Sequence, residues 1–163
     1  MLASLSGDRH VVIFDAAGAA GLNPESGQPL WRYPWQSQSE INAAQPVVIG
    51  PNQLFISSVD GSALLEVACS GDTWAATPVW QNRRLKAYYS NPIARGSYIY
   101  GLDLGILVCL NVETGEREWK GGRYGHGQML LADDLLIILA ESGELILVEA
   151  TPDDNNELGR FQA

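Results

Sequence analysis

The feature that most constrains this chain is a repeated segment in which a glycine lies between two short apolar runs. Four such segments occur, and their glycines are separated by 43, 44 and 38 residues. A period of about 40 residues indicates a series of similar supersecondary units, each of which needs its neighbours to cover its apolar faces. The glycine provides the backbone conformation of a tight turn between two antiparallel strands. The aligned glycines are Gly18, Gly61, Gly105 and Gly143.

Each unit continues into a polar turn and then a tryptophan. Gly27, Gly71 and Gly115 lie in these turns at a spacing of 44 residues, and in the first and third units a Trp follows four residues later. The second unit carries an insertion, so its equivalent is Trp80 in preference to Trp74. In the fourth unit the polar run 153–157 replaces the turn, and Phe161 is expected at the Trp position. The predicted markers of packing between units are Trp31, Trp80 and Trp119.

One more short strand is expected before each hairpin, so every unit is predicted to contain four antiparallel strands. Four strands per roughly 40 residues is the composition of a β-propeller blade. Continuous apolar runs such as ILVCL and LLIIL suit strands that are covered on both faces, as in stacked blades. The predicted fold is therefore all-β, a single propeller over residues 1–163. The expected first strands are 2–5, 46–49, 92–94 and 128–131, and the expected blades are 2–35, 44–81, 91–120 and 127–162.

Charge and composition exclude several classes of partner. The net charge of −9 argues against nucleic acid or an anionic membrane surface as the main partner. No apolar run approaches the roughly 20 residues of a membrane-spanning helix, and the first ten residues do not form a signal peptide. The two cysteines form no disulfide framework and leave the compartment undecided. Seven of the ten basic residues fall between positions 83 and 123, which indicates either a solvated face or a patch for an anionic ligand.

The segments CLNVETGEREW and GLNPESGQPLW resemble the repeat of quinoprotein-like propellers, in which an Asp or Asn, a Thr-Gly turn and a Trp follow one another. The segment 122–152 is similar to that of bacterial quinoprotein-like repeat proteins. The family includes eight-bladed alcohol dehydrogenases that use pyrroloquinoline quinone, and non-catalytic relatives in outer-membrane assembly. The resemblance implies a periplasmic or cell-envelope location. The residues that carry it are Asn23, Ser26, Gly27 and Trp31, and Asn111, Thr114, Gly115 and Trp119.

Members of this family usually have more than four blades. We therefore expect half of an eight-bladed ring, a piece of a longer or engineered chain, or a closed four-bladed propeller. A half ring would leave the outer faces of its first and last blades apolar and open. Either a protein partner or a second copy, as in a homodimer, would then close the ring.

The sequence assigns no catalytic residue, metal ligand or cofactor. The resemblance implies that a quinone dehydrogenase needs a Ca²⁺ site, a catalytic Asp, a Trp floor and often adjacent cysteines, and no residue here matches these by motif. The acidic run 153–157 lacks the alternating spacing of a Ca²⁺ loop and is predicted to be a solvated turn. The two histidines form no metal-binding pattern. A fragment of an oxidoreductase that uses pyrroloquinoline quinone and Ca²⁺ is the alternative to a non-catalytic module for protein–protein interaction.

One glycine-rich segment, KGGRYGHG at 120–127, is a candidate ligand or interaction site. It leads into the first strand of the fourth blade and is expected at the mouth of the central channel. Lys120, Arg123 and His126, together with backbone N–H groups that glycines leave accessible, have the chemistry to bind an anion. The alternative is that the glycines form a tight crossover and Tyr124 packs over the rim. The sequence leaves both interpretations open.

Overall fold

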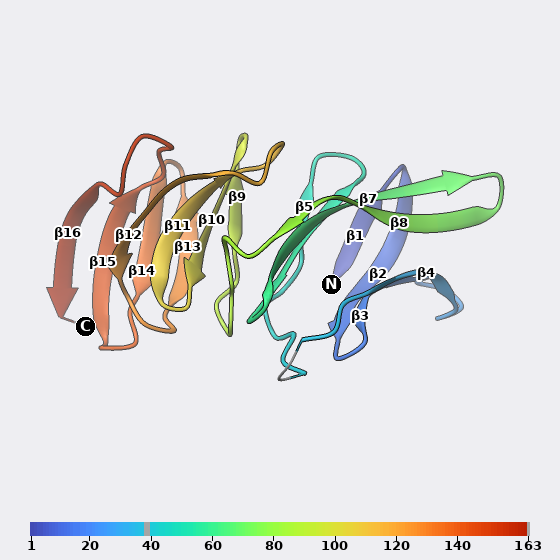
Figure 1. The fold of residues 1–163 in the computed structure, drawn as a ribbon, viewed down its shortest axis with the longest axis horizontal. Helices are drawn as coiled ribbons and strands as arrows, with labels where there is room; N and C mark the ends of the chain where they lie inside the picture. Colours follow the sequence, from blue (N-terminus) through green and yellow to red (C-terminus); the bar gives the residue numbers. More distant parts are fainter. Residues whose placement is uncertain (38–39, 163) are drawn as a thin grey trace.

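The computed structural model describes residues 1–37 and 40–162, which form sixteen strands in four sheets and contain no helix (Figure 1). The first sheet contains β1 (Leu2–Leu5), β2 (Asp8–Asp15), β3 (Gly18–Leu22) and β4 (Pro29–Pro34). The second contains β5 (Val47–Ile49), β6 (Gln53–Ser58), β7 (Gly61–Ser70) and β8 (Thr73–Asn82). The third contains β9 (Ile93–Arg95), β10 (Tyr98–Asp103), β11 (Ile106–Asn111) and β12 (Arg117–Arg123). The fourth contains β13 (Gln128–Ala132), β14 (Leu135–Leu139), β15 (Glu144–Glu149) and β16 (Glu157–Gln162).

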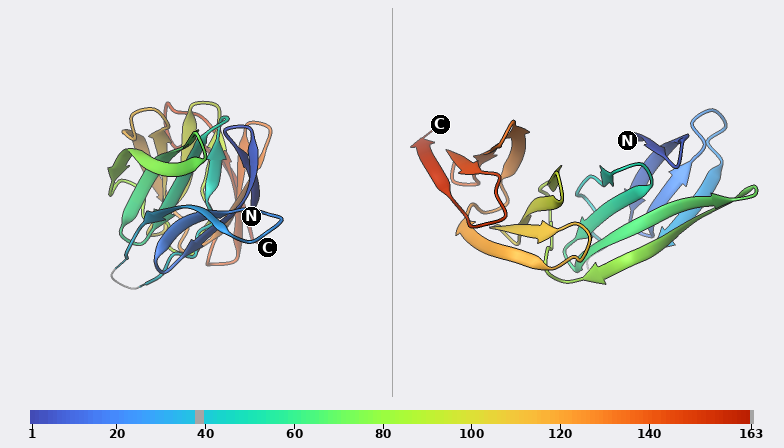
Figure 2. Two further views of the ribbon diagram at one scale, coloured as in Figure 1. Left: turned by 90° about the vertical axis from the view of Figure 1, so that its right-hand side faces the viewer. Right: turned by 90° about the horizontal axis from the view of Figure 1, so that it is seen from above.

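Every sheet is an antiparallel meander in which the strands lie side by side in chain order. The sheets follow one another along an open arc, with the first and last sheets at its two ends (Figure 2). The predicted all-β propeller with four blades of four strands is confirmed. The open arc agrees with half of a larger ring and not with a closed four-bladed propeller.

Three separate apolar cores hold neighbouring sheets together, and strand alternation explains how one sheet serves two of them. On β10, Ile99 belongs to the core between the second and third sheets, whereas Tyr100 belongs to the core between the third and fourth. On β6, Phe55 faces the third sheet and Ile56 faces the first. Successive side chains of a strand point to opposite faces. An inner sheet is therefore apolar on both faces, as its continuous apolar runs predicted.

The repeated polar turn has the same hydrogen bonds in the first and third sheets. In the third sheet the Asn111 side chain accepts bonds from the backbone N–H groups of Glu113 and Thr114, and the Gly115 N–H donates to the Asn111 carbonyl. In the first sheet Asn23 binds the N–H groups of residues 25 and 26 in the same way, and the Gly27 N–H closes the turn. This glycine has a positive φ, 67° at Gly115, and a residue without a Cβ adopts that conformation without steric strain.

A β-bulge recurs between the last two strands of every sheet and fixes the position of the tryptophan. Trp31 lies opposite Gly21, Trp80 opposite Leu64 and Trp119 opposite Cys109, each next to the bulge. In the fourth sheet the residue at this register position is Gly159, opposite Leu147. The expectation for Phe161 is therefore wrong. Phe161 lies opposite Leu145, and 55% of it is exposed.

The indole N–H groups of two tryptophans connect the second sheet to the third and the third sheet to the fourth. Trp80 Nε1 donates to the Val112 carbonyl at 2.7 Å, and Trp119 Nε1 donates to the Thr151 carbonyl at 2.9 Å. Both carbonyls follow the third strand of the next sheet. In the second sheet the long β7–β8 hairpin replaces this turn. Trp31 Nε1 donates instead to Nδ1 of His10, at 3.2 Å, within its own sheet.

Candidate interaction surfaces

The glycine-rich segment 120–127 does not gather its polar side chains into one site. Lys120 lies on β12, the outermost strand of its sheet, and its ammonium group pairs with Asp103. The Asp103 side chain is only 3% exposed, and it also accepts the Lys86 backbone N–H at 3.0 Å and lies 3.4 Å from the Lys86 ammonium group. Lys120 therefore belongs to a two-lysine bridge around a buried carboxylate.

Tyr124 and His126, from the same segment, point to different surroundings. Tyr124 is buried in the core between the third and fourth sheets, and its hydroxyl lies 3.2 Å from a Glu157 oxygen. Burial raises the pKa of Tyr124 above its ordinary value. His126 is exposed, its ring lies 5.3 Å from the Tyr88 ring, and its backbone N–H donates to Glu141. Arg123, at the end of β12, is also exposed.

These contacts bear directly on the expected anion site. Lys120, Tyr124 and the His126 backbone each bind a carboxylate of the chain itself, from Asp103, Glu157 and Glu141 respectively. An incoming anion would have to displace or approach three negative charges. Tyr124 packs in the core between the third and fourth sheets, and a ligand or interaction site at 120–127 stays a prediction.

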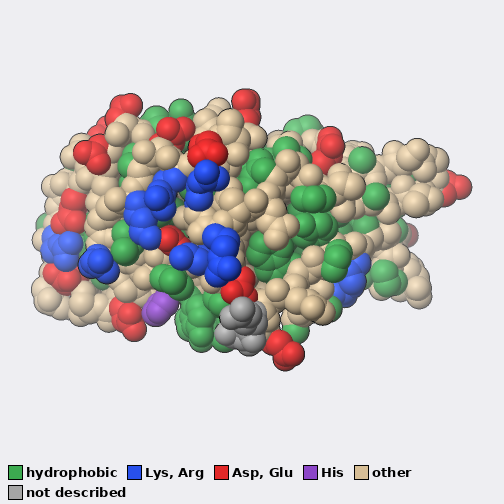
Figure 3. Space-filling model, viewed as in Figure 1, with side chains coloured by type: hydrophobic (Ala, Val, Ile, Leu, Met, Phe, Trp, Pro, Cys, Tyr) green, Lys and Arg blue, Asp and Glu red, His purple; other side chains and the backbone are tan. Residues whose placement is uncertain are grey.

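Part of the wider basic region is likewise paired with acids. Figure 3 shows Lys and Arg side chains gathered on one face of the molecule, over the third sheet and with Asp and Glu among them. Arg84 pairs with Glu116 at 2.7 Å, and Arg83 lies 3.9 Å from Asp60. Exposed ion pairs of this kind contribute little to stability and are screened by salt. The region is a mixed-charge surface.

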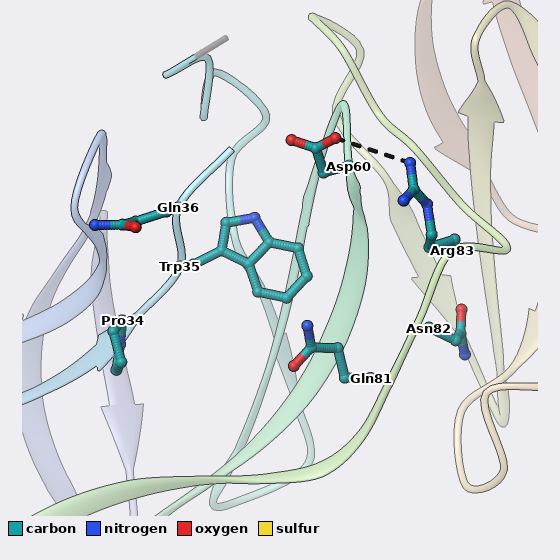
Figure 4. Close-up of a pocket in the computed structure, with 7 residues that line it drawn as sticks. All are labelled: Pro34, Trp35, Gln36, Asp60, Gln81, Asn82 and Arg83. Atoms are coloured by element: carbon teal, nitrogen blue, oxygen red, sulfur yellow. Dashed lines mark ion pairs between the residues drawn. The ribbon is translucent and has the colours of Figure 1, made fainter. Parts of the chain in front are cut away.

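A cavity of about 430 Å³ lies between the first and second sheets (Figure 4). The Trp35 side chain lies between the other labelled lining residues, and Trp35 is 6% exposed, with its indole N–H donating to Ser58 at 2.9 Å. Of the polar groups around it, Gln81 binds the Tyr33 hydroxyl and Asn82 binds the Gly115 carbonyl. The remaining lining residues are Pro34, Gln36, Asp60 and Arg83. The lining has the chemistry to hydrogen-bond a small polar group, and the residues that form it include no Ser, Thr, Cys, Lys or His.

Sequence reasoning missed this cavity because its residues come from three distant segments that share no motif. The chain positions 34–36, 60 and 81–83 meet only where the first two sheets pack. The one local signal was Trp35, a large side chain in a connection where a polar residue is more usual.

An extended apolar surface lies on the open face of the fourth sheet. We use this term for Leu130, Ile137, Leu139, Leu145 and Phe161, which are linked by cross-strand pairing and point away from the third sheet. Leu130 is 54% exposed, Leu139 47% and Phe161 55%. A groove of about 300 Å³ runs along the face between β13, β14 and β15. Sequence analysis expected such a face on the last blade of a half ring.

The first sheet has a corresponding open face at the other end of the arc. It contains Leu2, Val11, Ile13 and Leu22, which point away from the second sheet. Leu2 is 53% exposed, and the other three are half-buried. The arc therefore ends in a sheet face with exposed apolar residues on both sides, and on the first sheet this face also carries the Asp15–Arg32 ion pair, because Arg32 lies opposite Ala20.

Within residues 1–37 and 40–162, no three His, Cys, Asp or Glu side chains are grouped in a way that would hold a metal ion. In the same residues, no helix has the length and apolar character needed to cross a membrane. Cys109 is buried, and desolvation raises the pKa of its thiol to about 12.

Comparison with known proteins decides the family. A family model described as outer membrane protein assembly factor BamB matches residues 1–121. The chain belongs to this family. The resemblance to quinoprotein-like repeats that the sequence suggested is thereby confirmed. No curated protein matches the chain.

Two solved structures have a fold similar to that of this chain. The crystal structure of BamB from Moraxella catarrhalis has a TM-score of 0.71 and 17% identity, over 93% of this chain and 48% of that one. The computationally designed Ika8 protein has a TM-score of 0.70 and 11% identity, over 99% of this chain and 48% of that one. The chain thus spans about half the length of both.

Proposed function

We propose that this chain is a non-catalytic propeller module of the BamB family that serves as a scaffold for protein–protein interaction. The observation that carries the proposal is the open face of the fourth sheet. Soluble monomers rarely leave a contiguous apolar surface of more than a few hundred Å² uncovered. A partner protein or a second copy of the chain that packs on this face would bury it.

The chemistry of the face favours a β-sheet as the covering element. Its leucine and isoleucine side chains resemble those on the covered side of the same sheet, where Leu136, Ile138 and Ile146 pack on the third sheet. Sheets stack face to face at about 10 Å with interdigitating apolar side chains. A flat apolar face of four strands therefore suits another blade better than a small ligand.

The titratable groups support a role without catalysis. The buried thiol of Cys109 is held protonated by its raised pKa, and burial also raises the pKa of the neighbouring Tyr100. Neither group lines the Trp35 cavity or the groove of the fourth sheet. Pyrroloquinoline quinone requires a cation held by clustered oxygen ligands, and no three carboxylate, His or Cys side chains of residues 1–37 and 40–162 are grouped to hold one. We propose that the module acts without this cofactor, and, from its family, that it works in the cell envelope.

Protection from chemical labelling tests the proposal. Leu139→Cys on the open face and Val79→Cys on β8 provide a matched pair, since the two residues are 47% and 48% exposed. A Cys69→Ser background removes the exposed native thiol. When the protein is expressed in its native host and treated with a permeant maleimide, we expect slower labelling at position 139 than at 79. Equal rates would show that nothing covers the face and would refute the scaffold.

A second measurement addresses the oxidoreductase alternative. The purified chain is titrated with pyrroloquinoline quinone and Ca²⁺, and quinone absorbance and dye-linked alcohol oxidation are recorded. We expect no change in either signal. Saturable absorbance change with turnover would replace the non-catalytic proposal.

A further inference from the structure

We propose that a second copy of this chain covers both open faces at once and closes a ring of eight blades. The fourth sheet of each copy would pack on the first sheet of the other, giving two identical interfaces related by a two-fold axis. This inference rests on the proposed function, because it names the protein that binds the open face of the fourth sheet.

The first sheet carries the residue pattern that receives a neighbouring blade inside this chain. On its open side, Val11 lies opposite Leu22 and Ile13 opposite Ala20. On the side of the second sheet that packs on the first, the corresponding pairs are Leu54 with Leu65 and Ile56 with Ala63. The last pair before the hairpin turn is Asp15–Gly18 in the first sheet and Ser58–Gly61 in the second. The two apolar pairs lie at the same distance from this turn in both sheets. The open face of the first sheet is thus built like a covered one.

The fourth sheet supplies the complementary side. At each internal junction the earlier sheet offers large side chains to the next, as Tyr100, Leu102 and Leu107 of the third sheet do to the fourth. The open face of the fourth sheet offers Leu130, Ile137 and Leu139 in the same direction along the arc. A further blade stacked there would continue the existing junctions.

The curvature of the arc indicates how many blades complete the ring. The chain superposes on the BamB structure with a TM-score of 0.71 while covering 48% of that chain. Its blades therefore follow the curvature of a propeller about twice its length. Because the two open faces lie at the ends of one arc (Figure 2), a second identical arc has both complementary faces in place.

Sedimentation velocity with the purified 163-residue chain and three variants tests the inference. We expect twice the chain mass for the unaltered protein at micromolar concentration. Leu139→Asp and Leu2→Asp each place a carboxylate in both junctions of a self-dimer, which should weaken association by about a hundredfold or more. Both positions are about half exposed, so the blades should stay folded, and circular dichroism checks this. Val79→Asp on β8, equally exposed but in the second sheet, which carries neither open face, should remain a dimer.

Mixing the two monomeric variants provides the decisive result. The intact first sheet of Leu139→Asp can still meet the intact fourth sheet of Leu2→Asp, so an equimolar mixture should form a heterodimer through one junction. A dimer that pairs two fourth sheets would instead persist in Leu2→Asp and would overturn the proposal. An unaltered chain that stays monomeric would also overturn it. Protection of position 139 in cells would then still support the scaffold with another partner, so the two failures are distinguishable.

Discussion

The repeated glycines provide a graded test of how the hairpins are built. Gly61 is the first residue of β7 and has a φ of +146°. A Cβ added there would lie 2.4 Å from the carbonyl oxygen of Asn82, which is backbone of the neighbouring strand β8. Gly143 also has a positive φ, +85°, but the nearest atom to an added Cβ is the end of the Gln162 side chain at 3.7 Å. Only the first position combines an unfavourable φ with a backbone clash.

These contacts give different costs for the same substitution. The unfavourable backbone conformation costs about 1 to 3 kcal/mol at either position. Displacing the hydrogen-bonded backbone of β8 adds about 1 to 3 kcal/mol at Gly61 only. We therefore expect Gly61→Ala to destabilise the fold by about 2 kcal/mol more than Gly143→Ala.

Urea unfolding followed by circular dichroism measures the difference. At constant slope, the midpoint of Gly61→Ala should fall well below that of Gly143→Ala. If the two variants unfold at the same urea concentration, the backbone clash has been relieved without cost and the argument from geometry is wrong.

Three further perturbations test other contacts. Asp103→Asn leaves two lysines facing a neutral group and should cost about 2 kcal/mol, whereas Asp15→Asn at the exposed pair with Arg32 should cost less than about 1 kcal/mol in the same urea assay. Burial lowers the pKa of His10, so as the pH drops below 6.5 the unfolded chain binds a proton more readily than the folded chain, and the melting temperature should fall. In a His10→Leu variant the melting temperature should fall less over the same pH range. An equal fall in both proteins would contradict the burial argument. Trp119→Phe removes the donor to the Thr151 carbonyl and should speed amide exchange in residues 149–157 by several-fold, leaving the first sheet unaffected.

Much of the fold follows from local patterns. The hairpin glycines, the Asn-x-x-Thr-Gly turn and the apolar runs each encode structure within about ten residues, and strand β1 lies at the predicted residues 2–5. Phe161 was misplaced because a bulge, not the distance from the preceding turn, sets the register of β16. The Asp103 bridge and the Trp35 cavity escaped prediction, since their residues meet only after separate strands or sheets have packed.

The candidate site was harder to predict than the fold. A glycine-rich segment with basic residues has the composition of an anion site, but the carboxylates that occupy it come from 103, 141 and 157. Their positions depend on how the third and fourth sheets stack. The open faces were easier to anticipate, because a strand with apolar residues at consecutive positions requires a cover on each side.

The three cores share no residue, and this has a consequence for how the chain can change over generations. Each junction depends only on the two sheets that form it, so stability is close to a sum over adjacent pairs. Duplication or loss of one whole unit of about 40 residues leaves every remaining junction intact. A deletion of half a unit exposes an apolar face in the middle of the series. The smallest tolerated step in length is therefore one blade, and propellers of different size can descend from one another by such steps.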